Sequence, residues 1–209
     1  MNAAHNASRR DWHGLLMALA LAAAGPAAAH AGHGTVGSGN FLDGFLHPMT
    51  GPDHLIAMVA VGLWGAQLGS PAVWLLPIIF PLVMAVGGFL GLLGVPMPGV
   101  DLGVVLSGLV LGLCVAFAAR PALWIPAVIV GAFGLLHGHA HGTAMPMSGS
   151  PMAFGAGFVA ATGLLHLCGI VIGVLVRWPT GAQVVRAGGA VIAVVAAYSF
   201  IGLTTGWQA

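Results

Sequence analysis

Long apolar runs almost free of charge most constrain what this chain can fold into. Hydrophobic residues make up 59% of its 209 residues, and charged residues make up 4%, against about 25% in typical soluble proteins. A helix needs about 20 apolar residues to cross the hydrocarbon core of a membrane. The chain is therefore predicted to be an all-α, polytopic membrane protein, and no basic stretch indicates nucleic-acid binding.

Breaks rich in glycine and proline divide the apolar sequence into six expected membrane helices, all within one domain over 32–209. Short connections predict antiparallel neighbours in a compact bundle in contact with the lipid bilayer. The expected spans are Phe41–Ala66, Val73–Leu93, Val100–Ala119, Leu123–His141, Met152–Val176 and Val184–Leu203.

The first 31 residues have the pattern of a secretory signal peptide. Arg9 and Arg10 precede an apolar core, and the alanine-rich stretch that follows offers cleavage after Ala29 or Ala31, as signal peptidase sites require. Residues 1–31 are therefore predicted to be removed, which leaves a periplasmic N-terminus on a protein of the bacterial inner membrane.

The remaining arginines agree with this orientation. With the N-terminus outside, the loops after the first, third and fifth spans are cytoplasmic. Arg120 falls in the loop after the third span and Arg177 in the loop after the fifth. Arg186 lies just inside the sixth span. No Lys or Arg falls in an exterior loop, as the positive-inside rule predicts.

Histidines are concentrated in these apolar runs, where polar side chains are costly unless they are functional. The chain has ten histidines. His47, Asp53 and His54 lie in the first expected span, where an ideal helix would hold the two imidazoles about 10 Å apart. Two prolines and a glycine between them predict a broken helix that brings the three side chains together. A buried His–Asp pair that only ties helices is the alternative.

The fourth and fifth expected spans carry the other candidates. His137 and His141 are four residues apart, so they share a helix face and can bind one divalent ion. His139 points to another face, toward a partner, a headgroup or water. His166 is a candidate deeper in the membrane, or a hydrogen-bond tie between helices. Asp101 adds a carboxylate at the outer side, or only favours the start of its helix.

Topology arranges these candidates in two layers. An outer layer holds His47, His137, His141 and Asp101, and a central layer holds Asp53, His54 and His166. No histidine falls near the cytoplasmic end of a span, which indicates an ion path entered from outside. Imidazole with carboxylate suits Ni²⁺, Co²⁺, Zn²⁺, iron or Cu²⁺ rather than Mg²⁺ or Ca²⁺. The ion is expected as cargo, and no prosthetic group is expected.

Two further patterns bear on architecture. The tetrapeptide Gly-apolar-Leu-His ends at His47, His137 and His166, and two halves of three spans each would form an inverted repeat. Pro77 and Pro81 flank Phe80 and predict a kinked second span, with Phe80 as a gate or as packing only.

At these motifs the chain resembles the HupE/UreJ family of nickel permeases. The matches are the stretch from His47 through Asp53-His54 and the segment His137-Gly-His-Ala-His141-Gly. The resemblance implies a six-span permease, not an enzyme, that supplies nickel, or sometimes cobalt, to hydrogenase or urease. It also implies Asp101 where the family has an acidic residue. The family's second motif continues with Glu where this chain has Ala144. If that Glu coordinates or delivers the ion, this chain lacks one ligand, and the alternatives are weaker binding, another metal or the use of Asp101 instead.

Two other functions remain open at this point. A membrane sensor or chaperone would bind the metal without transporting it, although the short cytoplasmic loops leave little surface for docking. A di-iron membrane oxygenase also uses clustered histidines, but such enzymes need about eight of them on the cytoplasmic face.

Overall fold

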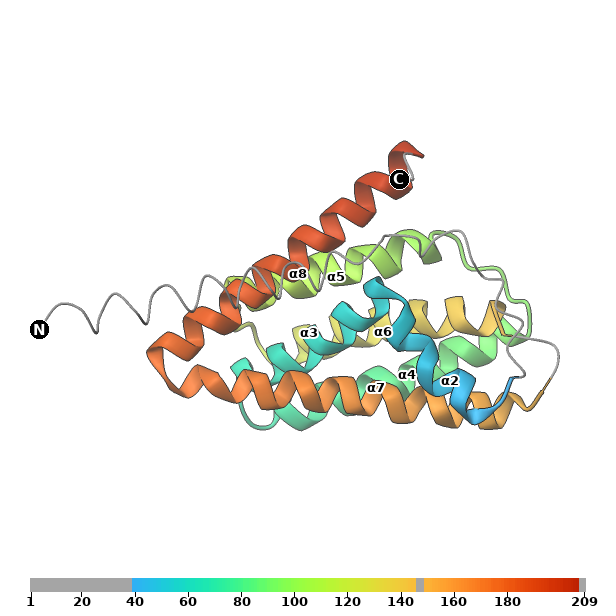
Figure 1. The fold of residues 1–209 in the computed structure, drawn as a ribbon, viewed down its shortest axis with the longest axis horizontal. Helices are drawn as coiled ribbons and strands as arrows, with labels where there is room; N and C mark the ends of the chain where they lie inside the picture. The colour runs from blue at the N-terminus through green and yellow to red at the C-terminus, as the bar shows by residue number, and fades with distance from the viewer. Residues whose placement is uncertain (1–38, 146–148, 207–209) are drawn as a thin grey trace, which may run out of the picture.

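A computed structural model describes residues 39–145 and 149–206. The expected signal peptide and its cleavage region lie outside the described residues. The described part is helical almost throughout (Figure 1). Its elements are α2 (Phe41–Thr50), α3 (Pro52–Leu68), α4 (Ala72–Leu92), α5 (Val100–Ala116), α6 (Trp124–Thr143), α7 (Pro151–Gly173), the 3-10 helix η1 (Val174–Arg177) and α8 (Pro179–Thr205).

The helices follow the expected spans closely. α4 to α7 each begin within one residue of the expected position, and α8 begins five residues earlier, at Pro179. Three segments are long and apolar enough to cross a membrane: α4, α7 with η1, and α8; α5 is a shorter apolar helix. The all-helical membrane character is therefore confirmed, while the count of six crossings remains a prediction.

The first expected span is two helices, as its prolines and glycine predicted. Gly51 separates α2 from α3 with φ −95° and ψ 108°, an extended conformation. The residue before a proline is disfavoured in the α region, and Pro52 then opens α3 at a position where its missing N–H costs nothing. At its other end α2 starts from a capping box between Asn40 and Asp43, which fixes where the helix begins.

Glycines bring the dominant helix pairs into backbone contact. α4 packs mainly on α6, α2 and α3 on α7, and α5 on α8. A Cβ added at Gly138 of α6 would collide with the Met84 carbonyl, and one added at Gly62 of α3 would collide with the His166 carbonyl. Small residues at such crossings allow close approach in membranes. By contrast, a Cβ at Gly163 meets nothing within 4 Å, so that glycine is not a packing residue.

The direction of each pair follows from the same contacts. Along α4 and α6, Phe80 lies against Gly134 and Gly88 against Gly142, so these helices run parallel. α3 and α7 are also parallel, because Gly62 lies beside His166 and Leu63 beside Gly173. α5 and α8 are antiparallel. If successive spans cross the membrane in alternating directions, spans two and four are parallel, and so are spans one and five. Spans three and six are then antiparallel, as the contacts show.

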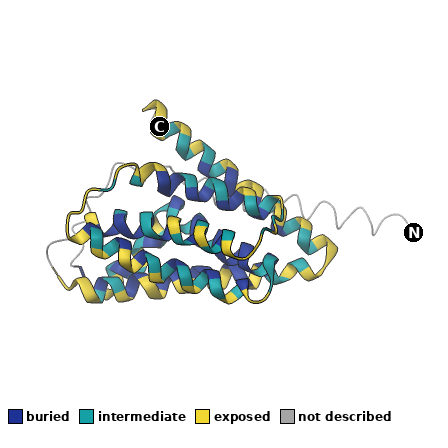
Figure 2. Ribbon diagram, turned by 180° about the vertical axis from the view of Figure 1, so that it is seen from behind, coloured by how far each residue is buried: buried dark blue, intermediate teal, exposed yellow. Residues whose placement is uncertain are grey.

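Exposed residues lie along the outward faces of the helices (Figure 2), and many of them are large and apolar. Leu82, Val128, Val171 and Val194 are each more than 60% exposed. In a water-soluble protein such a continuous surface would be a liability, whereas lipid tails solvate it. The polar groups lie inside, where they form the site described next.

Candidate metal centre

Four imidazoles from three helices converge inside the bundle. The His54 ring centroid lies 4.4 Å from that of His141 and 5.1 Å from that of His137. His47 joins them through His141, with ring centroids 4.9 Å apart. We call these four residues the histidine cluster. The break at Gly51 makes this possible, because it allows His47 of α2 and His54 of α3 to reach the same ring of α6.

This arrangement differs from the expected two layers. His54 was assigned to the central layer, yet it contacts both His137 and His141 of the outer layer. The break at Gly51, which the prolines predicted, lets His47 and His54 both contact His141. The outer histidines and His54 therefore form one group.

Hydrogen bonding fixes the state of His137. Its Nδ1 lies 2.9 Å from the Phe133 carbonyl oxygen, and a carbonyl only accepts, so Nδ1 carries the proton. The other nitrogen, Nε2, then has a free lone pair. It is buried and has no hydrogen-bond partner among the described residues. A backbone bond that sets the tautomer of a histidine is common behind metal ligands, so Nε2 is prepared to accept an ion.

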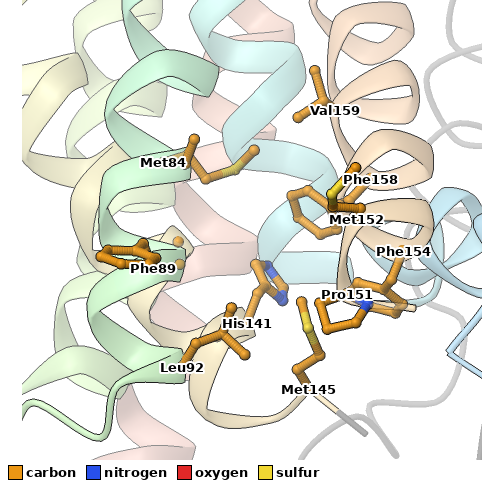
Figure 3. A pocket seen from close by; sticks show the side chains of 15 residues that line it. Met84, Phe89, Leu92, His141, Met145, Pro151, Met152, Phe154, Phe158 and Val159 are labelled. Carbon is orange, nitrogen blue, oxygen red and sulfur yellow. The ribbon is translucent and has the colours of Figure 1, made fainter. Parts of the chain in front are cut away.

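Apolar and aromatic side chains surround the cluster. Phe158 of α7 lies 4.3 Å from His141 between ring centroids, and Phe154 lies 5.7 Å from His47. His141 also reaches a cavity of about 330 Å³ between α4, α6 and α7. Figure 3 shows its ring pointing into this cavity near Met145. His141 is therefore the cluster member through which the cavity meets the imidazoles.

Asp53, the neighbour of His54 in the first turn of α3, is buried, with 5% of its surface exposed. The hydroxyl of Ser199 on α8 donates a hydrogen bond of 2.8 Å to its Oδ1. The contact ties α8 to α3.

Two expected ligands lie elsewhere. His139 is buried, and its Nε2 lies 2.7 Å from the Val95 carbonyl oxygen in the loop after α4. It therefore contacts the chain itself rather than the partner, headgroup or water that its spacing suggested. Asp101 is exposed in the first turn of α5, so its side chain is not buried with the imidazoles.

His166 lies beyond Phe80 as seen from the cluster. Phe80 makes edge contacts with both His137 and His166, at 5.4 and 5.3 Å between ring centroids. It is fully buried in α4 between Pro77 and Pro81. Phe80 thus contacts an imidazole of the cluster and the imidazole of α7, and both the gate and the packing interpretation remain predictions.

In the described part of the chain, no three His, Cys, Asp or Glu side chains are placed to hold one ion together. The cluster instead supplies several imidazoles at short range. Neutral imidazoles are the kind of ligand that borderline divalent metals prefer.

Sequence reasoning missed several neighbours of the site. Phe154 and Phe158 are four residues apart and share a face of α7 with Thr162 and His166, a spacing that was visible in advance. Ser199 gave no signal, because a lone serine near the end of the chain carries no pattern.

The fold and the buried imidazoles define the class: an all-helical membrane protein with histidines gathered inside its bundle. The family model described as HupE / UreJ protein matches residues 17–199. The chain belongs to this family. It is 41% identical over 187 residues to Protein HupE of Rhizobium leguminosarum bv. viciae. The aligned region covers 90% of this chain and 95% of that protein. No solved structure matches the chain.

Proposed function

We propose that this protein is an inner-membrane permease that takes up Ni²⁺, with Co²⁺ as the next candidate and Zn²⁺ after it. The ion serves the maturation of a metalloenzyme such as hydrogenase or urease, as membership of the HupE / UreJ family implies. The observation that carries the proposal is the buried Nε2 of His137, which has a lone pair and no hydrogen-bond partner among residues 39–145 and 149–206, in a ring next to that of His54.

The cluster suits a divalent metal better than protons. Imidazoles this close would repel one another if all were protonated, whereas a metal ion attracts several neutral rings at once. Asp53 supplies negative charge that offsets part of the ion's charge in a medium of low dielectric constant. The broken helix between α2 and α3 resembles the discontinuous helices that build ion sites in transporters.

The direction of transport is inward. The cluster lies toward the end of the bundle where α2 begins and α6 ends, and Arg120, Arg177 and Arg186 lie toward the other. Under the positive-inside rule the arginine end is cytoplasmic and the N-terminus is periplasmic. A divalent ion moving inward gains about 4.6 kcal/mol per 100 mV of membrane potential. The sequence has no nucleotide-binding motif, so a facilitator or secondary carrier fits best.

Ala144 modifies this function without removing it. The family pattern has Glu at this position, whereas here Ala144 follows the last turn of α6. We propose that the chain coordinates the ion with imidazoles and Asp53 and lacks one acidic ligand, which makes its binding weaker than that of relatives that carry the glutamate.

Uptake of radiolabelled ⁶³Ni²⁺ into cells tests the proposal. Cells that express the wild type should accumulate nickel, and His54→Ala should reduce uptake at least tenfold because it removes the ring that contacts two others. Cys168→Ser is the matched control, since this exposed side chain of α7 lies outside the cluster. Equal uptake by wild type, His54→Ala and cells without the protein would refute the proposal.

The rival functions give different results in the same preparation. A sensor or chaperone would bind Ni²⁺ in purified form but produce no flux into reconstituted vesicles. A di-iron oxygenase would purify with iron and its electronic absorption bands. Either result would replace the permease proposal.

A further inference from the structure

Two buried polar side chains of α7 are left unexplained by the histidine cluster. His166 is 1% exposed and Thr162 is fully buried. Neither ring nitrogen of His166 nor the hydroxyl of Thr162 has a hydrogen-bond partner in the described part of the chain. Each such group costs about 1–3 kcal/mol, so native proteins retain few of them. The expected alternative for His166 is a hydrogen-bond tie to a neighbouring helix; the Pro77 carbonyl of α4 lies beside the ring, but the pair does not meet the distance and angle of a hydrogen bond.

Thr162 behaves differently from other helical threonines of this protein. Thr143, Thr204 and Thr205 each donate a hydrogen bond to the carbonyl one turn earlier in their own helix, the usual solution for a threonine in a helix. The hydroxyl of Thr162 does not. Because Thr162 and His166 are four residues apart, they share one face of α7.

A backbone oxygen of α4 lies beside the His166 ring. The Pro77 carbonyl faces the His166 ring, but it lies outside hydrogen-bond geometry. In a regular helix this oxygen would accept from the N–H of residue 81, which is Pro81 and has none. The two prolines therefore leave an available oxygen beside an available imidazole.

Phe80 contacts both this group and the histidine cluster. Its ring makes edge contacts with His137 and with His166. An ion that leaves His137 and passes Phe80 would next meet His166. The donors there are one imidazole and two neutral oxygens, a poorer set for a borderline metal than several imidazoles.

We infer that His166, Thr162 and the Pro77 carbonyl form a second, weaker site for the transported divalent metal ion. The inference rests on the proposed function and adds an intermediate stop to it. A weaker site after a stronger one favours release toward the cytoplasmic end, because conduction requires binding that is weak enough to leave.

Calorimetric titration of the purified full chain in lipid nanodiscs with NiCl₂ tests this site. The wild type should show two binding events of different affinity. Thr162→Val keeps the shape and removes the hydroxyl, and it should weaken only the weaker event, on the order of tenfold. His166→Leu should abolish that event. Thr204→Val is the matched control, because its hydroxyl bonds only within α8, and it should change neither event.

Two further readouts separate a metal site from a structural role. Without metal, Thr162→Val should have a Tm equal to or above that of the wild type, because valine removes a buried hydroxyl that has no partner. In cells, His166→Leu should lower the maximal rate of ⁶³Ni²⁺ uptake and leave the half-saturating concentration unchanged, since the cluster that captures the ion is intact.

The outcomes distinguish this inference from the function on which it rests. If His54→Ala abolishes uptake while both α7 variants retain both binding events and the wild-type rate, the second site is refuted and the permease stands. A single binding event in the wild type, or a lower Tm of Thr162→Val with unchanged binding, also refutes the site. If the wild type neither binds nor transports nickel, the permease proposal itself fails.

Discussion

At the scale of single residues, the histidines differ in what their second nitrogen does. His137 and His139 each place one ring nitrogen against a backbone carbonyl. The first then presents its other nitrogen near the His54 ring, whereas the second lies near the loop after α4. Spacing four residues apart predicted that His137 and His141 share a face. It could not predict the partner of His139, because that partner is the backbone of a loop 44 residues away.

Ser199 is the residue whose role is easiest to test. Ser199→Ala removes the hydrogen bond to Asp53 and leaves a buried carboxylate less stabilised, which costs about 1.5–3 kcal/mol for a charged group. The half-saturating Ni²⁺ concentration for uptake should rise about tenfold. Ser199→Thr keeps a hydroxyl and should restore most of the affinity.

The control for this prediction is a neighbouring hydroxyl of the same helix. Thr205 bonds to the Ile201 carbonyl of α8, and Thr205→Val should leave nickel uptake unchanged. Wild-type affinity in Ser199→Ala would show that the contact with Asp53 has no part in binding.

At the scale of helices, apolar run length predicted where the elements lie but not which ones pair. The expected bounds of α4 to α7 were close because glycine and proline punctuate this sequence. The pairing depends on which glycine faces which backbone, as at Gly138 and Met84, and one sequence does not reveal that. Short connections suggested neighbouring spans as partners, whereas the dominant partners are two or more spans apart.

The dominant pairs bear on the proposed inverted repeat. An inverted repeat would exchange span one with four, two with five and three with six. Under this exchange the pair α4–α6 becomes the pair α7–α3, and the pair α5–α8 is unchanged. The weaker pairs of α3 with α4 and α5 have no equally strong counterparts in the second half. The repeat remains a prediction, supported by the main contacts alone.

The break at Gly51 gives a test at this scale. Gly51→Ala with Pro52→Ala restores helix-forming residues and removes the restriction that a proline imposes on its predecessor. A continuous helix would separate His47 from His54 by two turns, about 10 Å. Nickel uptake should fall at least tenfold while helix content by circular dichroism stays equal or rises.

Gly188→Ala in α8 is the matched control, because a Cβ there meets nothing within 4 Å. It should retain wild-type uptake. If the double variant also transports normally, the broken helix is not required for the histidine cluster.

At the scale of the whole molecule, charge is divided between the two ends. Arg120, Arg177 and Arg186 are exposed near the ends of α5 and η1 and the start of α8, and Arg186 donates a hydrogen bond to the Ala116 carbonyl. Asp43 and Asp101 lie in the first turns of α2 and α5, at the opposite end (Figure 1). The sequence predicted this division from the loops, and the parallel and antiparallel pairs agree with it.

Cysteine labelling measures the orientation. In a chain with Cys114 and Cys168 replaced by alanine, Pro98→Cys lies in the exposed loop before α5 and Ala122→Cys in the exposed loop before α6. A membrane-impermeant maleimide should label Pro98→Cys in spheroplasts and Ala122→Cys only after permeabilisation. The reverse pattern would invert the proposed direction of transport.

The pairing of distant spans also constrains biogenesis. Helices enter the bilayer in chain order, yet the main packing partner of each early helix comes later. The partner of α4 is α6, that of α2 and α3 is α7, and that of α5 is α8. A nascent chain that has inserted only as far as α5 has none of its dominant partners. His47 and His54 remain without the α6 rings until that helix arrives. The chain therefore finishes most of its assembly late, after synthesis has reached the last helix, and truncation of α8 should leave α5 a substrate for membrane proteases.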